Sequence, residues 1–421
     1  MGCICSKGGG KPKVRLVLLG VPKCGKTTFV KQLVYECQGG FDQATCDGFV
    51  KDIQYNVLRC IGLVLEKLKE KGVEVDEFHK SQAEVVSSLY DRFASVDRWS
   101  VEVLMLEDYL AENREAIDAI VAVSKMKPLR EYMESHLATE PAGLFIRDAE
   151  KIFTGQFEPK KDHILRVRLP DVGDHDYTFD LDTFELDVTV VDGERETRKV
   201  WQEKVEACDA VCYVSSLADY FPQEEEEEDS GKDQEERGNS KDKGRKTRFY
   251  SVSPVGAKEE SLALFSQLMA CLDKEKGKGK EKMLFVLLNK TDIVHNKCAK
   301  DVAKGALAKG SEAGVASNGD HLLSYEISQV EASLTLVREE FAALAGLLTR
   351  GHEGEGKDQS KAGEGGKGAK ADTTRTTSLS SSEEYLNCQS LCSLDPSTFR
   401  HVFQAMKKDI EERKDLPHPV S

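Results

Sequence analysis

A glycine-rich stretch near the start of the chain has the residue types and spacing that hold phosphate. The segment GVPKCGKTT, residues 20–28, fits the pattern G-x-x-x-x-G-K-[ST] of a P-loop. Its glycines let the loop curl so that backbone N–H groups point at phosphate oxygens. Lys26 is expected to reach the β- and γ-phosphates, and the Thr27 hydroxyl is expected to bind Mg²⁺. The nucleotide contacts predicted from this loop are Gly20, Lys23, Cys24, Gly25, Lys26, Thr27 and Thr28.

A second stretch predicts which base the site accepts. The apolar run LFVLLNKTD, residues 284–292, ends in Asn289, Lys290 and Asp292. A carboxylate at the end of a strand can accept hydrogen bonds from the N1–H and the 2-amino group of guanine, and adenine lacks that pair of donors. Asn289 and Lys290 can brace the loop and cover the ring. The two motifs together predict a guanine nucleotide and disfavour a P-loop ATPase or kinase.

Both motifs follow apolar runs that read as buried strands. Such runs, bounded by turn residues, fall at 14–19, 177–180, 185–191, 210–216, 283–288 and 387–391. Helical spacing follows several of them, for example at 26–37 and 261–272. This alternation is typical of a parallel sheet with crossover helices.

The pattern between the first helix and about residue 160 is different. Apolar residues recur with helical spacing over 46–70, 78–93, 99–111, 112–124 and 127–136, with almost no strand signal. Adjacent helical segments of this length pack as a bundle. The expected fold class is therefore α/β, with a P-loop domain at 14–40 and 161–421 and an all-helical domain inserted at 41–160.

Two segments of biased composition interrupt the second half of the chain. Residues 222–248 run from an acidic block to a basic block, and residues 351–382 are rich in Gly, Lys, Ser and Thr. Because both lack apolar residues that could offset the entropy of ordering, we predict disordered surface insertions. A charged run of this kind is usually just solvated.

Composition excludes several other classes of protein. The net charge is −15, and no clustered basic face indicates a nucleic-acid site. No apolar run approaches the roughly 20 residues that a membrane span needs. The 12 cysteines do not have metal-ligand spacing, so we expect free thiols in a reducing compartment.

The first six residues, MGCICS, match the pattern for N-myristoylation of Gly2. Cys3 and Cys5 are available for palmitoylation, and lysines at 7, 11 and 13 follow. One myristoyl chain binds a membrane only marginally, so the second acyl site and the lysines complete an anchor. The sequence predicts a lipidated basic segment at 1–13 and a place on the cytoplasmic face of a membrane, the plasma membrane in particular.

The order of motifs resembles that of a heterotrimeric G-protein alpha subunit. The resemblance covers nearly the whole chain: the P-loop, the helical insertion, DHILRVRLPDVG (162–173), VVDGERETRKVW (190–201), YVSSLADY (213–220), NKTD and LCSLDPSTFRHVFQAM (391–406). It implies a Ras-like GTPase domain, GTP or GDP as ligand with Mg²⁺, and two switch segments that respond to the γ-phosphate.

The resemblance also implies roles for individual residues. Arg168 matches the arginine that stabilises transition-state charge on the γ-phosphate. Cys392 and Ser393 stand where the family contacts the guanine ring. The further nucleotide contacts that the resemblance implies are Leu165, Arg166 and Gly193.

Several positions depart from the family pattern. Asp171 stands where the family has a Mg²⁺-binding Thr, and Val190 replaces a Mg²⁺-associated Asp. Lys23 replaces a Glu that pairs with the switch arginine. With Trp201 fixing the register of the second switch, Asp192 replaces a Gly and Glu194 replaces the catalytic Gln.

These departures leave three possibilities open. An ionised Glu194 can only accept hydrogen bonds, whereas Gln orients the attacking water by donating and accepting. We therefore expect a signal-transducing GTPase whose hydrolysis is slow. The alternatives are Glu194 as a working general base, and a non-hydrolysing scaffold in which GTP or GDP is a structural ligand.

The segments that the family uses to bind partner proteins also depart from the family pattern. The family uses a long N-terminal helix to engage the βγ dimer, but only about a dozen residues precede the first strand here. The second switch, residues 195–201, could still contribute to βγ binding. The tail DLPHPVS carries two prolines in place of the usual receptor peptide, so we do not expect receptor coupling.

Overall fold

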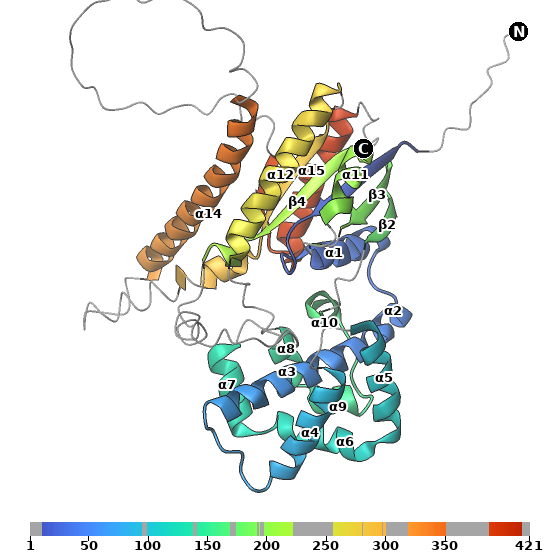
Figure 1. The fold of residues 1–421 in the computed structure, drawn as a ribbon, viewed down its shortest axis with the longest axis vertical. Helices are drawn as coiled ribbons and strands as arrows, with labels where there is room; N and C mark the ends of the chain where they lie inside the picture. The colour runs from blue at the N-terminus through green and yellow to red at the C-terminus, as the bar shows by residue number, and fades with distance from the viewer. Residues whose placement is uncertain are drawn as a thin grey trace, which may run out of the picture.

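The computed structural model places a six-stranded sheet and a helical bundle one above the other, joined through α1, α2 and α10 (Figure 1). The residues that it describes are 11–94, 99–137, 141–168, 174–191, 193, 198–221, 256–279, 281–296, 298–299, 319–350 and 387–414. The predicted lipidation site at Gly2, Cys3 and Cys5 lies outside these residues, as do the two segments predicted to be disordered.

The sheet is mostly parallel and has the strand order β2-β3-β1-β4-β5-β6. Only β2 and β3 pair in antiparallel fashion among the described strands. The strands are β1 Lys13–Leu19, β2 His175–Asp180, β3 Glu185–Val190, β4 Ala210–Ser216, β5 Met283–Asn289 and β6 Asn387–Ser390. Every residue of β4 and β5 is buried, as expected for parallel strands covered on both faces.

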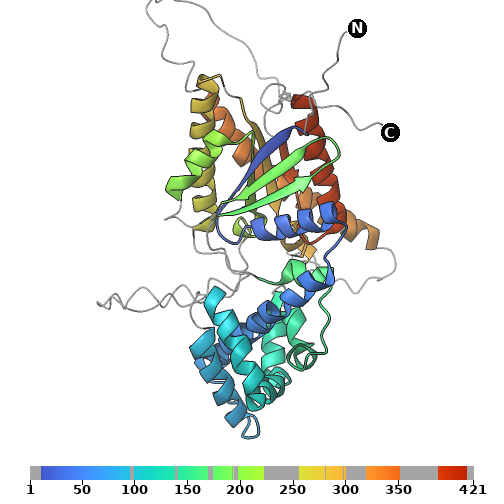
Figure 2. The ribbon, with the colours of Figure 1, turned by 90° about the vertical axis from the view of Figure 1, so that its right-hand side faces the viewer.

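Helices cover both faces of the sheet, which lies between them in Figure 2. Helices α1 (Lys26–Gln38) and α15 (Pro396–Arg413) lie on one face, where the rings of Phe29 and Phe399 meet at 5.2 Å. Helices α11 (Arg198–Ala207), α12 (Ala257–Gly277) and α14 (Gly319–Arg350) lie on the other, where Phe265 and Phe341 meet at 4.8 Å. A short 3₁₀ helix, η1 Leu217–Asp219, follows β4, and residues 291–296 are helical.

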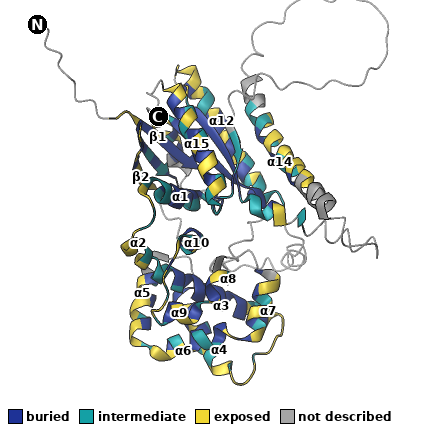
Figure 3. Cartoon of the chain, turned by 180° about the vertical axis from the view of Figure 1, so that it is seen from behind, coloured by how far each residue is buried: buried dark blue, intermediate teal, exposed yellow. Residues whose placement is uncertain are grey.

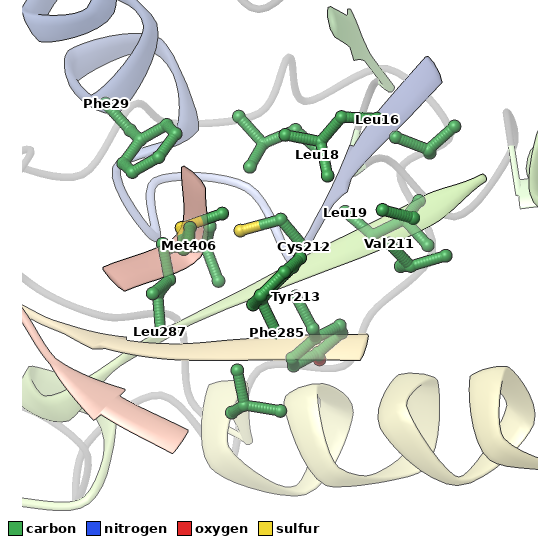
Figure 4. Packing of buried hydrophobic residues seen from close by; sticks show 14 of the residues in the cluster. Leu16, Leu18, Leu19, Phe29, Val211, Cys212, Tyr213, Phe285, Leu287 and Met406 are labelled. Carbon is green, nitrogen blue, oxygen red and sulfur yellow. The ribbon is translucent and has the colours of Figure 1, made fainter. Parts of the chain in front are cut away.

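The core of this part is built from the strands and from the helices on both faces. Leu16 and Leu18 from β1, Cys212 from β4, Phe29 from α1 and Met406 from α15 pack together at its centre (Figure 4). The first and last helices of the described chain thus share one hydrophobic cluster with the central strands.

A second hydrophobic cluster holds the helical part together, and α3 lies at its centre. The burial colours of Figure 3 show α3 dark blue along most of its length. At Gly62 the neighbouring α4 comes so close that an added Cβ would lie 2.1 Å from Cγ of Tyr90. The helices are α2 Gln43–Gly48, α3 Val50–Glu70, α4 Lys80–Phe93, α5 Trp99–Glu112, α6 Arg114–Ser124, α7 Lys127–His136, α8 Pro141–Ile146, α9 Ala149–Phe153 and α10 Lys161–Arg166.

The predicted fold class, an α/β domain with an all-helical insertion, is confirmed. The single helix expected at 46–70 is instead two, because α2 ends at Gly48 and α3 begins at Val50. Helix α14 was not predicted.

The domain limits at residues 40 and 160 stay predictions, and Val167 packs in the helical cluster. Within the described ranges, no helix combines the length and hydropathy of a membrane span.

Candidate functional site

The predicted site residues converge at the carboxyl edge of the parallel strands. The P-loop follows β1, Gly193 lies just beyond β3, Asn289 ends β5, and Cys392 and Ser393 follow β6. In open α/β sheets, ligands bind at this edge. The four segments come from widely separated stretches of sequence, and the parallel register of the strands brings them together.

The P-loop has a backbone that requires its glycines. Gly20 has a φ of 153°, and an added Cβ would lie 2.3 Å from the carbonyl oxygen of Val214. Gly25 has a φ of 107°, and an added Cβ would lie 2.0 Å from Nδ2 of Asn289. Residues with a side chain rarely adopt these backbone conformations, and neither position has room for a Cβ atom. Lys23 also has a positive φ of 65°, so the loop curls as a phosphate-binding loop must.

Lys26 lies inside this curl with only 2% of its surface exposed. Its Nζ donates to the carbonyl oxygens of Gly20 at 2.9 Å and Val21 at 3.1 Å. A buried ammonium group is tolerable only when its donors are satisfied in this way. Thr27 and Thr28 are half-buried in the first turn of α1. The amine and both hydroxyls therefore gather where the helix begins, which is a favourable place for anions.

Asn289 links three loops of the site. Its Nδ2 donates to the carbonyl oxygen of Cys24 at 2.9 Å, and its Oδ1 accepts from the backbone N–H of Ser393 at 3.0 Å and from Ser393 Oγ at 2.9 Å. Gln32 on α1 adds a bond from Nε2 to the carbonyl oxygen of Ser393 at 3.0 Å. The phosphate end and the base end of the site are thus one hydrogen-bonded unit.

Asp292 lies beside Cys392 at the base end. The Cys392 thiol donates to Oδ1 of Asp292 across 3.6 Å. Burial and the Asp292 carboxylate both raise the pKa of Cys392, so the group next to Asp292 is a neutral thiol. Lys290, between Asn289 and Asp292, has a φ of 65°, which turns the chain sharply after β5.

The segment that carries Arg168 is held through its backbone by two buried side chains. Lys31 on α1 donates from Nζ to the carbonyl oxygens of Ile164 at 3.0 Å and Val167 at 2.7 Å. Asn56 on α3 contacts both backbone polar groups of Arg168. Of the other residues predicted here, Leu165 is buried and Arg166 ends α10.

Gly193 lies directly against the P-loop. An added Cβ would come within 2.6 Å of the carbonyl oxygen of Gly20 and 2.7 Å of the backbone nitrogen of Pro22. Val190 is buried at the end of β3, and Trp201 of α11 is 2% exposed and packs in the core. The segment after β3 therefore lies against the P-loop at Gly193, and the strand before it ends in the apolar side chain of Val190.

The residues predicted for catalysis and metal binding are not all described. Arg168 and Thr27 are described, whereas Asp171 and Glu194 lie outside the described residues. In the part of the chain that the structure describes, no group of three or more His, Cys, Asp or Glu residues could hold a metal ion. Of the two metal ligands predicted from the sequence, Thr27 and Asp171, the structure therefore describes Thr27.

Three residues that position the site were missed from the sequence: Lys31, Gln32 and Asn56. All three are buried although they are polar. The signal in the sequence was a polar residue among apolar neighbours on a helix. Phe29, Val30 and Leu33, for example, flank Lys31 and Gln32. A polar residue on such a face needs a partner, and the partners here come from distant segments.

A family model described as "G-protein alpha subunit" matches residues 6–345 of the chain. The chain belongs to the G-protein alpha subunit family. The matched range holds the P-loop, the helical part, Gly193 and Asn289. Helix α15 and the loop of Cys392 lie beyond the match, although Asn289 and Asp292 bond with that loop.

Two curated relatives are distant in sequence. The chain is 23% identical over 205 residues to guanine nucleotide-binding protein subunit alpha-1 of Trichomonas vaginalis, covering 49% of this chain and 48% of that protein. It is 23% identical over 293 residues to guanine nucleotide-binding protein alpha-11 subunit of Caenorhabditis elegans, covering 69% of this chain and 72% of that protein. The match to the Trichomonas protein thus spans about half of that relative's length.

Proposed function

We propose that this G-protein alpha family member is a guanine-nucleotide-binding signal transducer that switches between GTP-bound and GDP-bound states. The observation that carries the proposal is the hydrogen bonding of Asn289, which joins the P-loop at Cys24 to the base-side loop at Ser393. One nucleotide can therefore contact both ends of a single preformed unit. The names of both relatives, guanine nucleotide-binding proteins, support the same ligand.

The residues of the loops fit the two halves of that nucleotide. The curled P-loop with Lys26 at its centre suits an oligophosphate, because it offers backbone N–H groups and one ammonium. Asp292 with its neutral neighbour Cys392 suits a base that presents two N–H donors. Bound Mg²⁺ would neutralise phosphate charge, and Thr27 would hold it, with Asp171 as the predicted second ligand.

For the chemistry we propose slow GTP hydrolysis. Arg168 would stabilise the charge that develops on the γ-phosphate. Glu194 can accept a hydrogen bond from water but cannot donate one to phosphate while it is ionised. The second candidate is a non-hydrolysing scaffold with GTP or GDP as structural ligand, and the buried Val190 in place of a carboxylate favours it.

Nucleotide titration tests the binding proposal. GDP and a non-hydrolysable GTP analogue should bind the full chain and change the fluorescence of the buried Trp201, with tighter binding of the analogue when Mg²⁺ is present. ATP should not compete with GTP, since adenine cannot satisfy Asp292. Binding of ATP as tight as that of GTP would refute the assignment of the base.

Single-turnover phosphate release tests the hydrolysis proposal. Glu194→Gln restores a side chain that both donates and accepts, and we expect the rate to rise by about a hundredfold, the lower end of what one positioned catalytic group contributes. A lower rate in Glu194→Gln would identify Glu194 as a general base instead. Absence of phosphate release from both proteins would favour the scaffold.

We further propose that the chain is anchored to the cytoplasmic face of the plasma membrane through Gly2, Cys3 and Cys5. The motif MGCICS and the nearby lysines support this. Metabolic labelling with a myristate analogue should mark the wild type and not Gly2→Ala.

Family membership favours a βγ dimer as partner, with the exposed face of α11 as its contact. Co-purification of the GDP-bound chain with βγ tests this, and we do not propose receptor coupling.

A further inference from the structure

The carboxamide of Asn56 holds both backbone polar groups of Arg168. Its Oδ1 accepts from the Arg168 N–H at 3.2 Å, and its Nδ2 donates to the Arg168 carbonyl oxygen at 3.0 Å. Two bonds to the N–H and C=O of one residue fix the peptide planes on both sides of it, as in a hydrogen-bonded pair of antiparallel strands. The direction of the Arg168 Cα–Cβ bond is thereby fixed as well.

The contact requires an asparagine. The second N–H of Asn56 Nδ2 donates to the carbonyl oxygen of Asp52 at 2.6 Å, within α3. Both amide protons and the amide oxygen are therefore used, and Asn56 is only 1% exposed. Aspartate could accept from Arg168 but could not donate to either carbonyl, and an apolar side chain could do neither.

The contact also joins the two parts of the molecule. Asn56 belongs to α3, at the centre of the helical cluster, whereas Lys31 belongs to α1 beside the P-loop. Lys31 holds the carbonyl oxygen of Val167, and Asn56 holds that of the next residue, Arg168. The backbone at Arg168 is therefore set from both sides, and its position depends on how the helical part sits on the sheet part.

We propose that Asn56 is a positioning residue for GTP hydrolysis, through which the helical part places Arg168 at the γ-phosphate. This rests on the proposed function, in which Arg168 stabilises the transition state. Asn56 does not touch the nucleotide in this proposal. It acts by keeping the catalytic arginine where its guanidinium reaches the reacting group, and small misplacements of such a group are costly.

The test compares single-turnover GTP hydrolysis by the full chain in variants at Asn56, Arg168 and Gln54. Asn56→Leu removes both bonds and should slow hydrolysis by about tenfold, with GDP affinity unchanged. Gln54→Leu is the matched control, because Gln54 on the same helix donates to the carbonyl oxygen of Ile152 and not to the switch. It should hydrolyse GTP at the wild-type rate. Hydrogen exchange of the Arg168 amide should speed up in Asn56→Leu alone.

A double-mutant cycle separates positioning from a structural role. In an Arg168→Ala background, Asn56→Leu should cause no further loss of rate, because the group that it positions is gone. An equal loss in both backgrounds would overturn the proposal. Full wild-type activity of Asn56→Leu beside a slow Arg168→Ala would overturn it too.

Misfolding of Asn56→Leu, or a failure of hydrolysis through Arg168, would each be recognised. If Asn56→Leu does not fold, Asn56→Ser carries the cycle, because its short hydroxyl cannot reach both backbone groups of Arg168 and it buries no charge. Its loss of rate should again vanish in Arg168→Ala. If the wild type releases no phosphate, or Arg168→Ala hydrolyses GTP normally, hydrolysis through Arg168 is refuted and the role of Asn56 with it. That failure is visible before any change at position 56.

Discussion

The base end of the site and its switch end are held together in different ways. At the base end, the loops that would face the nucleotide bond with each other. Asn289 bonds the backbone of Cys24 and both the backbone N–H and the hydroxyl of Ser393, and the Cys392 thiol bonds Asp292. At the switch end, the hydrogen bonds come from side chains on two helices that flank the segment. Lys31 and Asn56 fix the segment before and at Arg168, while Gly193 rests on the P-loop.

We expect this difference to separate two quantities, the affinity for nucleotide and the rate of GTP hydrolysis. Apart from Lys23, the P-loop and the NKTD segment have the residue types that the resemblance to the family implies, and Asn289 joins the two by a hydrogen bond. At the switch end the backbone of Arg168 is held by Asn56, whereas the sequence comparison predicts Val190 and Glu194 at the positions of a family Asp and Gln. Substitutions at the two ends should therefore act on different quantities: nucleotide affinity at one end and hydrolysis rate at the other.

The largest effect is expected at the base end, from Asn289→Ala. It removes three hydrogen bonds and leaves buried groups of Cys24 and Ser393 without them, at about 1 kcal/mol for each bond. The affinity for GDP, measured by titration, should fall by roughly a hundredfold. The single-turnover rate of the bound fraction should change much less.

Asn289→Asp is the matched control for that prediction. It keeps an acceptor for Ser393 and loses the donor toward Cys24, so its affinity should lie between those of the wild type and Asn289→Ala. If Asn289→Ala slows hydrolysis while GDP binding stays intact, the division between the two ends is wrong.

A smaller effect, on turnover, is expected at the switch end from Gly193→Ala. The added Cβ would meet backbone atoms of Gly20 and Pro22 at under 3 Å, so the segment must shift away from the P-loop. Single-turnover hydrolysis should slow by about tenfold while GDP affinity stays near that of the wild type. Gly48→Ala, where an added Cβ meets nothing within 4 Å, should leave both quantities unchanged. An equal loss of GDP affinity would show that Gly193 serves binding as well.

The smallest effect concerns stability just after the base-side loop. Asp395 caps α15 by accepting from the backbone N–H groups of Ser397 and Thr398. Asp395→Ala should cost about 1 kcal/mol of unfolding free energy at pH 7. The side-chain hydrogen bond from Thr398 is the main cause that lowers the pKa of Asp395 to about 2.

The pH dependence of that difference has a defined sign. Because the pKa of Asp395 is lower in the folded chain than its ordinary value of 3.8, the stabilisation is present above that value and is lost as the pH falls towards 2. Denaturant unfolding between pH 7 and pH 2 would measure it. Asp395→Asn caps without titrating, so its difference from Asp395→Ala should stay constant with pH. A pH-independent difference between wild type and Asp395→Ala would contradict the assignment.

The regular elements were largely predictable because their hydrophobic pattern is local. The predicted strand at 210–216 has the bounds of β4, and the strand at 283–288 lacks only the last residue of β5. The helix predicted at 261–272 is too short, because α12 continues to Gly277 through polar turns that carry no apolar period. Helix α14 was missed since, over residues 328–345, where its burial is described, the buried residues Val330, Val337 and Phe341 are widely spaced.

The site was predictable where a motif fixes both residue type and spacing. The P-loop and Asn289 lie where the sequence predicted them, at the ends of β1 and β5. The contacts of Lys31 and Asn56 were not predictable, because their partners lie more than a hundred residues away and are backbone carbonyls, which have no signature in the sequence.

The two hydrophobic clusters imply an order of folding during synthesis. Every buried residue of the helical cluster lies between Ile53 and Val167, so that cluster can form once this stretch has left the ribosome. The sheet cluster, in contrast, joins Val14 to Ile410, and β6 completes the sheet from near the end of the chain. The candidate nucleotide site, which needs Ser393 beside Asn289, can therefore be completed only after residue 393 has left the ribosome. Until then the P-loop strand and its apolar faces lack their final neighbours, so we expect the emerging sheet to expose apolar surface for longer than the helical cluster does.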